Sequence, residues 1–162
     1  MKKERVVPKK NYLYLLLMIV GVVVLTLFIF NLNNKYQNRK LEKSYLDGYI
    51  NSININEIDN ILTEPNSETF IFLTSTNNID VYKLEVEMKK FIKKYNLRDN
   101  FIMIDYTNND VDFINKKFKT NIKNVPAIIY LKNGEFVKSI DSSDNILSIG
   151  DVEKLIEEYE VK

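Results

Sequence analysis

The 162-residue chain contains no cysteine, no histidine and no tryptophan. Without cysteine it can form no disulfide, no thiolate nucleophile and no cysteine-based zinc site. Without histidine it lacks the commonest metal ligand and the commonest general base at neutral pH, so a serine triad of the usual kind has no base. Thiol–disulfide chemistry is therefore excluded, and the chemical routes to other kinds of catalysis are few.

Glycine and proline are also scarce, with four and three residues, whereas 45% of the residues are hydrophobic and 28% are charged. This composition is typical of a globular chain. The net charge of +1 is unevenly distributed: residues 1–11 carry five basic residues and one acidic residue, residues 31–43 carry four and one, and residues 44–162 carry 14 and 20. An acidic domain is a poor candidate for nucleic-acid binding, because phosphate contacts need clustered Lys and Arg.

An uncharged, mostly apolar run of about 19 residues extends from Tyr12 to Phe30. As a helix, a run of this length spans a hydrocarbon core of roughly 30 Å. A cleaved signal peptide is the alternative, but no small-x-small cleavage site follows the run, and no cysteine is present for lipoprotein processing. We therefore predict a basic tail at residues 1–11, a transmembrane helix in the lipid bilayer at residues 12–32, and a juxtamembrane linker at residues 33–44.

Both flanks of this run are basic, and the N-terminal flank carries slightly more positive charge. The positive-inside rule then favours an N-terminus in the cytoplasm. We expect a single-pass protein of the cell membrane whose C-terminal domain is extracytoplasmic.

The remaining residues, 45–162, show alternating strand and helix patterns. The continuous apolar run TFIFLT is typical of a central strand covered on both faces. Apolar residues between Val81 and Tyr95 recur at helical spacing, with most of the lysines on the opposite face and Glu85 and Glu87 near the helix start, where acidic residues suit the helix dipole. Similar patterns predict further strands at residues 49–53 and 101–105, and further helices at residues 54–62 and 111–118.

The stretch NVPAIIYLKNGEF, residues 124–136, predicts a β-hairpin. An Asn-Gly step between two β-rich runs favours a type I′ turn, since both central residues of that turn need positive φ. Pro126 has no N–H and should therefore stand at the start of its strand. After the hairpin, Ser148 with Asp151 three residues later forms a capping box that predicts the start of a last helix.

The resulting order, β-α-β-α-β-α-β-β-α, with Val-Pro before the fourth strand and KNGE in the hairpin, resembles the thioredoxin family. The segments NVPAIIYLKNGEFV and LSIGDVEKLIEEY carry the resemblance, which extends over residues 49–161. It implies an α/β thioredoxin-like fold, a central mixed sheet flanked by helices, preceded here by one N-terminal transmembrane helix. In that family the proline is cis and the preceding residue offers its backbone to an extended substrate peptide. The resemblance places these roles at Pro126 and Val125.

The chain departs from the family where the redox chemistry would lie. The family has a Cys-x-x-Cys pair at the start of the long helix, whose N-terminus stabilises a thiolate. The family's buried acidic residue in the second strand, a proton relay, would fall at Ile71 or Phe72. Both halves of the redox machinery are therefore absent. In place of the thiol pair this chain has Asn77, Asn78, Ile79, Asp80 and Val81.

Other groups of residues suit chemistry, but structural roles explain them more simply. Asp80 could be a catalytic carboxylate, but a helix cap or first-turn acid is the simpler role. Ser75 and its neighbours Thr74 and Thr76 could include a nucleophile, but no histidine is available to activate it. An oxygen-rich loop could bind Ca²⁺, but it lacks the spacing and the glycine of an EF-hand, so loop and cap roles are favoured. The loop's oxygen-bearing residues are Asp105, Asn108, Asn109, Asp110 and Asp112; Tyr45, Tyr49 and Tyr106 should pack against the domain.

Together these patterns favour a non-catalytic protein-binding or scaffolding module on a membrane anchor. Val125, Pro126 and residues 77–80 would hold a protein or an extended peptide by backbone pairing, with no cofactor and no metal. One alternative is an accessory subunit of a secretion, bacteriocin-transport or envelope thiol–disulfide system whose partner supplies the chemistry. Another is an enzyme of a different class that uses acidic or hydroxyl groups.

The predicted orientation can be tested with protease. Protease added to intact cells or spheroplasts should remove residues 44–162, because the slight basic excess before residue 12 keeps the N-terminus inside. Immunoblotting of the N-terminal fragment gives the result. If the domain is protected until the membrane is broken, it lies in the cytoplasm.

Overall fold

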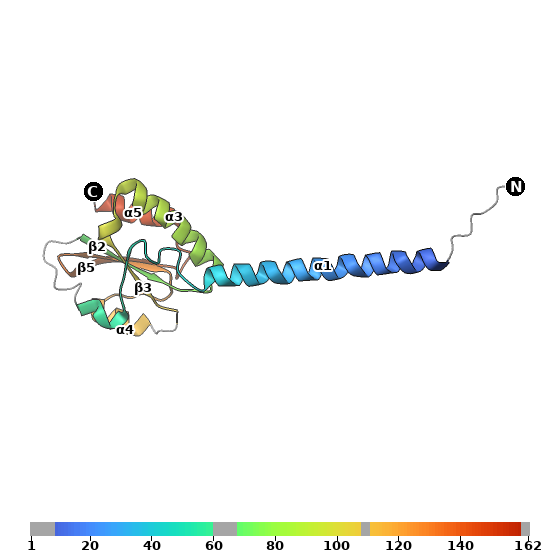
Figure 1. Ribbon diagram of the computed structural model, residues 1–162. Coiled ribbons are helices and arrows are strands. Elements are labelled where there is room, and N and C mark those ends of the chain that lie inside the picture. The colour runs from blue at the N-terminus through green and yellow to red at the C-terminus, as the bar shows by residue number, and fades with distance from the viewer. Residues whose placement is uncertain (1–8, 60–67, 108–110, 160–162) are drawn as a thin grey trace. The chain divides into compact units, whose positions relative to one another are not determined.

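The computed structural model describes residues 9–59, 68–107 and 111–159. The chain divides into two compact units, Met1–Lys40 and Leu41–Lys162. Helix α1, Lys9–Leu41, contains an 18-residue window of mean hydropathy 3.0, none of which is buried by protein, and by length and composition it can cross a membrane (Figure 1). The segment predicted as a linker, residues 33–44, continues this helix as far as Leu41, since it contains good helix formers and neither glycine nor proline.

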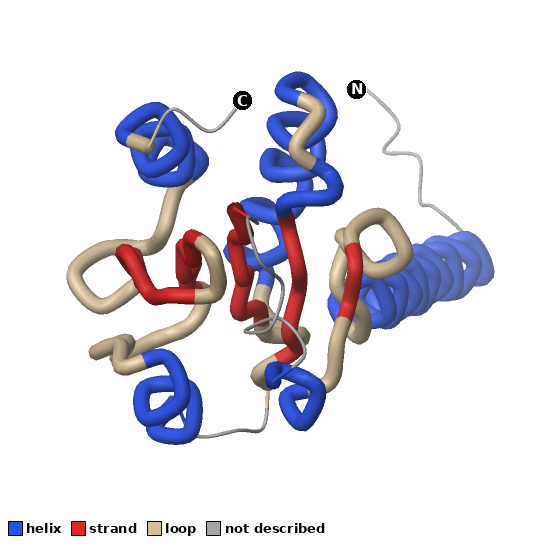
Figure 2. The backbone as a smooth tube through the Cα atoms, turned by 90° about the vertical axis from the view of Figure 1, so that its left-hand side faces the viewer, coloured by secondary structure: helices blue, strands red, loops and turns tan. Residues whose placement is uncertain are grey.

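The Leu41–Lys162 unit is built on a five-stranded mixed sheet of order β1-β3-β2-β4-β5. The central strand β2 pairs in parallel with β3 and antiparallel with β4, and β1 and β5 form the two edges. Helices lie on both faces of the sheet (Figure 2). The strands are β1 (Asn51–Ser52), β2 (Glu68–Thr74), β3 (Phe101–Asp105), β4 (Ala127–Lys132) and β5 (Glu135–Asp141).

Helices α3 (Ile79–Tyr95) and α5 (Ile149–Glu158) bury their apolar stripes against one face of the sheet. Helix α4 (Val111–Phe118) and the short 3₁₀ helix η1 (Ile55–Glu57) lie on the other face, and a second 3₁₀ turn, η2 (Arg98–Asn100), precedes β3. The predicted fold class and element order are confirmed. The helix predicted at residues 54–62 is described only as far as residue 59, and the rest of it lies outside the described residues.

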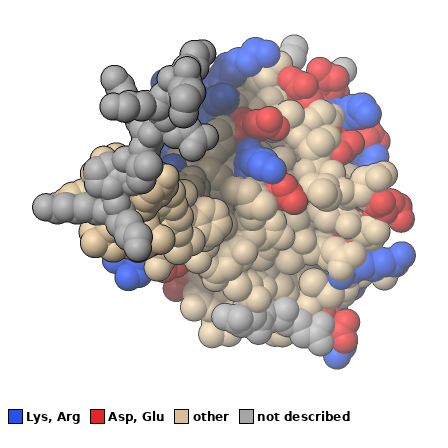
Figure 3. All heavy atoms as spheres, turned by 90° about the vertical axis from the view of Figure 1, so that its right-hand side faces the viewer, with Lys and Arg blue, Asp and Glu red and all other residues tan. Residues whose placement is uncertain are grey.

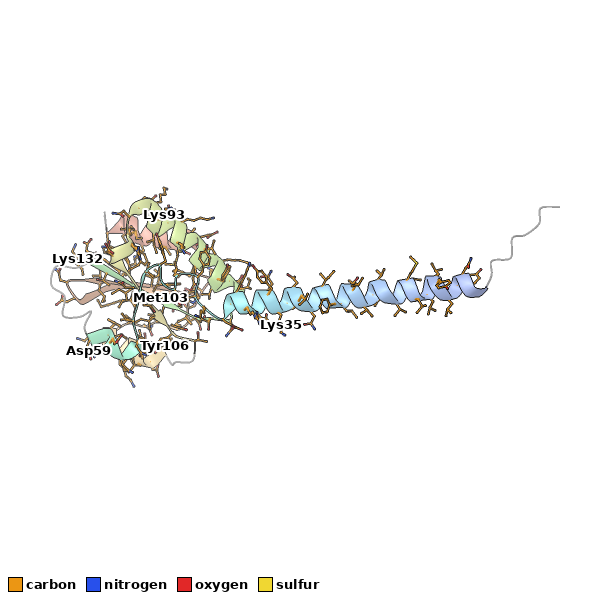
Figure 4. The ribbon with its side chains drawn as sticks, in the orientation of Figure 1. Lys35, Asp59, Lys93, Met103, Tyr106 and Lys132 are labelled. Atoms are coloured by element: carbon orange, nitrogen blue, oxygen red, sulfur yellow. The ribbon has the colours of Figure 1, made fainter. Side chains whose placement is uncertain are left out.

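Strand β2 separates two hydrophobic cores, because its successive side chains point to opposite faces of the sheet. Phe70 and Phe72 belong to the core under α3 and α5, whereas Ile71 and Leu73 belong to the core under α4. All four side chains are 0% exposed, so the prediction of a strand covered on both faces is confirmed. Figure 4 shows Met103 of β3 near the centre of the domain.

Local sequence signals account for the turn and cap geometry. Asn133 and Gly134 both have positive φ, 54° and 76°, as the predicted type I′ hairpin requires. Ser148 and Asp151 form the predicted capping box of α5. The Val125–Pro126 peptide bond is cis, and β4 begins at the next residue.

Residues 34–162, produced without the apolar run, should form a soluble, folded monomer, because the helical stripes and β2 close their own cores. Size-exclusion chromatography and a cooperative thermal transition followed by circular dichroism would show this. Aggregation, or the spectrum of a disordered chain, would contradict the domain boundary.

Candidate functional site

The residues that replace the thiol pair form the start of helix α3. Asn78 is the N-cap, and its side-chain oxygen accepts hydrogen bonds from the backbone N–H groups of Asp80 at 2.9 Å and Val81 at 3.3 Å. Asp80 lies in the first turn and forms an exposed ion pair with Lys83 at 2.9 Å. Asp80 therefore has the first-turn role that the sequence favoured over catalysis, and Asn78 is the cap.

The other two residues of this loop, Asn77 and Ile79, differ in how far they are free to contact another molecule. Asn77 has a left-handed backbone, with φ of 59°, and its N–H donates to the carbonyl of Leu41 at 2.7 Å. Ile79 is 47% exposed. One predicted backbone donor is thus already used inside the domain, whereas an apolar side chain remains open to a partner.

The cis-proline loop lies at the same end of the sheet. Ala127, the first residue of β4, pairs with Leu73 near the end of β2, and β2 then leads into residues 77–80. Pro126 is buried and Val125 is half-buried. The structure therefore brings the two predicted parts of the site to one end of the sheet.

Two residues at the end of β5 hold the cis-proline loop in place. The Asp141 carboxylate accepts the N–H groups of Lys123 at 2.7 Å and Asn124 at 3.4 Å, and Ser142 donates its hydroxyl to the Pro126 carbonyl at 2.9 Å. Burial raises the pKa of Asp141, but these N–H groups and the donors of Ser143 together outweigh it and bring the pKa below its ordinary value. The loop is therefore fixed up to Val125.

The backbone of Val125 is left available by this arrangement. No hydrogen bond within the described part of the chain uses its N–H or its C=O. A shallow hollow of about 330 Å³ lies against Asp141, with Ile140 and Leu147 as its apolar part and Asp144 among its acidic residues. A fixed loop with a free peptide group suits the addition of an extended chain.

The most deeply buried charge in the described residues is Glu85 of helix α3, which is 2% exposed. Its Oε1 accepts the hydroxyls of Thr74 at 2.5 Å and Ser44 at 2.8 Å, and its Oε2 accepts the N–H of Tyr45 at 2.6 Å. Burial raises the pKa of Glu85; the three hydrogen bonds lower it in part, and the negative charge of Asp105 raises it further, so the net shift is upward.

The sequence placed Glu85 among the acidic residues near the start of α3, but its side chain is buried. It stands four residues after Val81 and three before Met88, on the buried face of α3. A charged residue inside the apolar stripe was the signal that could have identified it. The sequence placed the family's buried acid at Ile71 or Phe72 of β2, and both side chains are apolar and fully buried. The buried carboxylate in the described part of this domain is that of Glu85, on helix α3.

The hydroxyl groups near this end of the sheet have structural partners. Thr74 donates to Glu85, and the N–H of Thr76 donates to the hydroxyl of Thr107 at 2.7 Å. Thr107 in turn donates to Asp105 at 2.5 Å. Asn108, Asn109 and Asp110 of the oxygen-rich loop lie outside the described residues, and the described ranges contain no group of three His, Cys, Asp or Glu side chains that could hold a metal ion.

The described surface carries charges of both signs, and the tyrosines singled out in the sequence pack on the domain. On the face drawn in Figure 3, Lys and Arg side chains are interspersed with Asp and Glu around uncharged areas. Tyr45 packs edge-to-face on Tyr82 with ring centres 5.5 Å apart, and Tyr106 is 2% exposed, so the predicted packing of these tyrosines on the domain is confirmed.

Comparison with known proteins supports the fold alone. No family model and no curated protein matches the sequence. Thioredoxin f2 in complex with ferredoxin:thioredoxin reductase has 15% identity and a TM-score of 0.54, over 70% of this chain and 97% of that one. Chlamydomonas reinhardtii thioredoxin f2 has 8% identity and a TM-score of 0.54, over 68% and 96%. A further protein, described as having a thioredoxin fold, has 19% identity and a TM-score of 0.53, over 69% and 97%.

The Leu41–Lys162 unit is thus a thioredoxin-fold domain, as the sequence predicted. The chain that carries it contains no cysteine, so it cannot itself exchange thiols and disulfides.

The buried carboxylate predicts a specific pH dependence. The folded-state pKa of Glu85 lies above its ordinary value of 4.5, so the stability linked to its protonation is present below about pH 4.5 and is lost as the pH rises through the folded pKa. Glu85→Gln removes this titration. Urea unfolding of residues 34–162 between about pH 4 and 8 should show wild type losing stability relative to Glu85→Gln as the pH rises.

Glu87→Gln, an exposed position on the same helix, is the matched control and should follow wild type across the series. A difference between wild type and Glu85→Gln that does not change with pH, or that changes in the opposite direction, would show that Glu85 is not the titrating group.

Proposed function

We propose that this protein is a membrane-anchored, non-catalytic module whose thioredoxin-fold domain binds a protein or an extended peptide at the cis-proline loop. The observation that carries this proposal is the loop itself. Val125 and Pro126 keep the family's geometry, and Asp141 and Ser142 hold it, although no cysteine remains for it to serve.

The proposed arrangement in the cell follows from helix α1. Residues 12–32 lie in the cell membrane, the basic tail of residues 1–11 stays in the cytoplasm, and residues 45–162 form the extracytoplasmic domain. The composition and length of α1 and the greater positive charge before residue 12 support this arrangement.

The partner would bind as an extended segment beside Val125, whose N–H and C=O can pair with a peptide backbone whatever its side chains are. Ile79 would add apolar contact from the start of α3, and the hollow beside Asp141 would take a side chain of the partner. Asn77, Asn78 and Asp80 contribute mainly by shaping the loop, because their polar groups already have partners in the domain.

An accessory role in a secretion, bacteriocin-transport or envelope thiol–disulfide system is the second candidate. One structural neighbour comes from a complex of ferredoxin:thioredoxin reductase and thioredoxin f2, which supports this candidate by analogy. In such a system the partner would supply the thiols that this chain lacks.

Substitution at the loop tests the binding proposal. Val125→Asp should weaken partner binding by about 1–3 kcal/mol, because it places a carboxylate without a partner where the bound segment excludes water. Asn78→Ala should cost about 1 kcal/mol of domain stability through loss of the α3 cap, and should change binding much less. Quantitative pull-downs from solubilised native membranes, with the full chain as bait, give the comparison.

Lys154→Ala, at an exposed position on α5, is the surface control. If wild type, Val125→Asp and Lys154→Ala recover the same partner equally, the cis-proline loop is not the binding surface.

A further inference from the structure

Residues 41–46, which we call the strap, cross the start of helix α3. The carbonyl of Leu41 accepts the N–H of Asn77, and the hydroxyl of Ser44 and the N–H of Tyr45 both donate to the carboxylate of Glu85. The strap thus uses a backbone donor of the very loop that replaces the family's thiol pair. All of these contacts lie within the Leu41–Lys162 unit.

Side chains add to this attachment. The Tyr45 ring packs on Tyr82 of α3, and the Lys89 ammonium lies 4.7 Å from the centre of the Tyr45 ring and 4.8 Å from that of Tyr49. Leu46, the last residue of the strap, is 0% exposed and belongs to the core under α3 and α5. The strap is therefore anchored at its far end by burial and along its length by polar contacts.

The fit between strap and loop leaves almost no space. The hollow between them measures only about 10 Å³, which is at the lower limit of the space that one water molecule needs. Its lining comes from both sides: Leu41, Lys43 and Ser44 of the strap, and Ser75, Thr76, Asn78, Tyr82 and Glu85 of the domain.

From these contacts we infer that the strap blocks backbone pairing at the Asn77 end of the partner site, and that Glu85 is the residue that holds the strap in place. The inference rests on the proposed function, since it concerns access to the same site. A partner that pairs with the N–H of Asn77 must first displace the carbonyl of Leu41. The half of the site at Val125 is free of strap contacts and can be occupied with the strap closed.

Glu85 holds the strap because two hydrogen-bond donors of the strap, the Ser44 hydroxyl and the Tyr45 N–H, donate to its buried carboxylate. The Ser44 hydroxyl has a single proton, which goes to Glu85 as the stronger acceptor, although the Met103 sulfur lies only 3.0 Å away. The Ser44 oxygen then accepts the N–H of Leu46 at 3.1 Å. Without Glu85, both Ser44 and Tyr45 would lose their acceptor in the domain, and the closed strap would be disfavoured.

The strap begins where helix α1 ends, and this place in the chain suits the control of a binding site. Leu41 is both the last residue of helix α1 and the residue that occupies the N–H of Asn77. Opening of the strap would free the N–H of Asn77 for a partner, so that the state of the strap controls this donor.

Hydrogen exchange of the full chain in lipid nanodiscs, resolved to single amides, tests whether the strap opens as one unit. In Glu85→Ala the amides of Tyr45 and Asn77 should both exchange at least about ten-fold faster than in wild type, because loss of the carboxylate frees the strap and with it the Leu41 contact. Amides of β2 and β3 should keep their wild-type rates. Glu87→Ala, on the exposed side of α3, is the control and should match wild type throughout.

If Tyr45 exchanges faster in Glu85→Ala but Asn77 does not, the two contacts are independent and the inference is wrong. If the amides of β2 and β3 also exchange faster, the Ser44→Ala variant decides, because it removes only one of the hydrogen bonds to Glu85. A smaller increase in exchange rate at both Tyr45 and Asn77 would then support the inference. No increase at Asn77 would overturn it. Partner capture that is insensitive to Val125→Asp would contradict the proposed function and leave these exchange results unaffected.

Discussion

Burial of a single carboxylate, that of Glu85, is the constraint on which this end of the domain depends. A charge that is 2% exposed needs hydrogen-bond donors, and the donors to Glu85 lie outside α3. They come from Thr74 at the end of β2 and from Ser44 and Tyr45 just after helix α1. The Glu85 side chain of helix α3 is thus connected to strand β2 through Thr74 and to the residues that follow helix α1 through Ser44 and Tyr45. The same carboxylate holds the segment whose Leu41 carbonyl occupies the N–H of Asn77.

The sequence predicted the fold correctly because its signals are local or periodic. The uninterrupted apolar run of β2 is buried only if both faces of the sheet are covered, and the apolar side chains along one side of α3 need a sheet to pack against. Asn133-Gly134 determines the hairpin turn, and Ser148 with Asp151 determines the start of α5. Each of these features depends on residues within a few positions of one another, so each can be recognised without knowing the tertiary structure.

The parts of the site that sequence reasoning missed depend on partners distant in the chain. Glu85 lies 41 residues from Ser44, and Asp141 lies 18 residues from Lys123, so neither pairing leaves a pattern in the sequence. Polar residues 33–44 were predicted to form a linker, although they continue α1 to Leu41 and then supply Ser44 to the buried network. The loss of cysteine and the cap or first-turn role of Asp80 were evident from the sequence, but the contact of Asn77 with Leu41 required the structure.

The central claim is that the cis-proline loop still contacts a partner although its redox chemistry is gone. The most direct test places a photoreactive amino acid at position 125 of the full chain in its native membrane, with position 154 on α5 as the control. Irradiation followed by mass spectrometry should give a discrete crosslinked partner from position 125 and not from position 154. Identical adducts from both positions, or a discrete partner from position 154 alone, would contradict the claim.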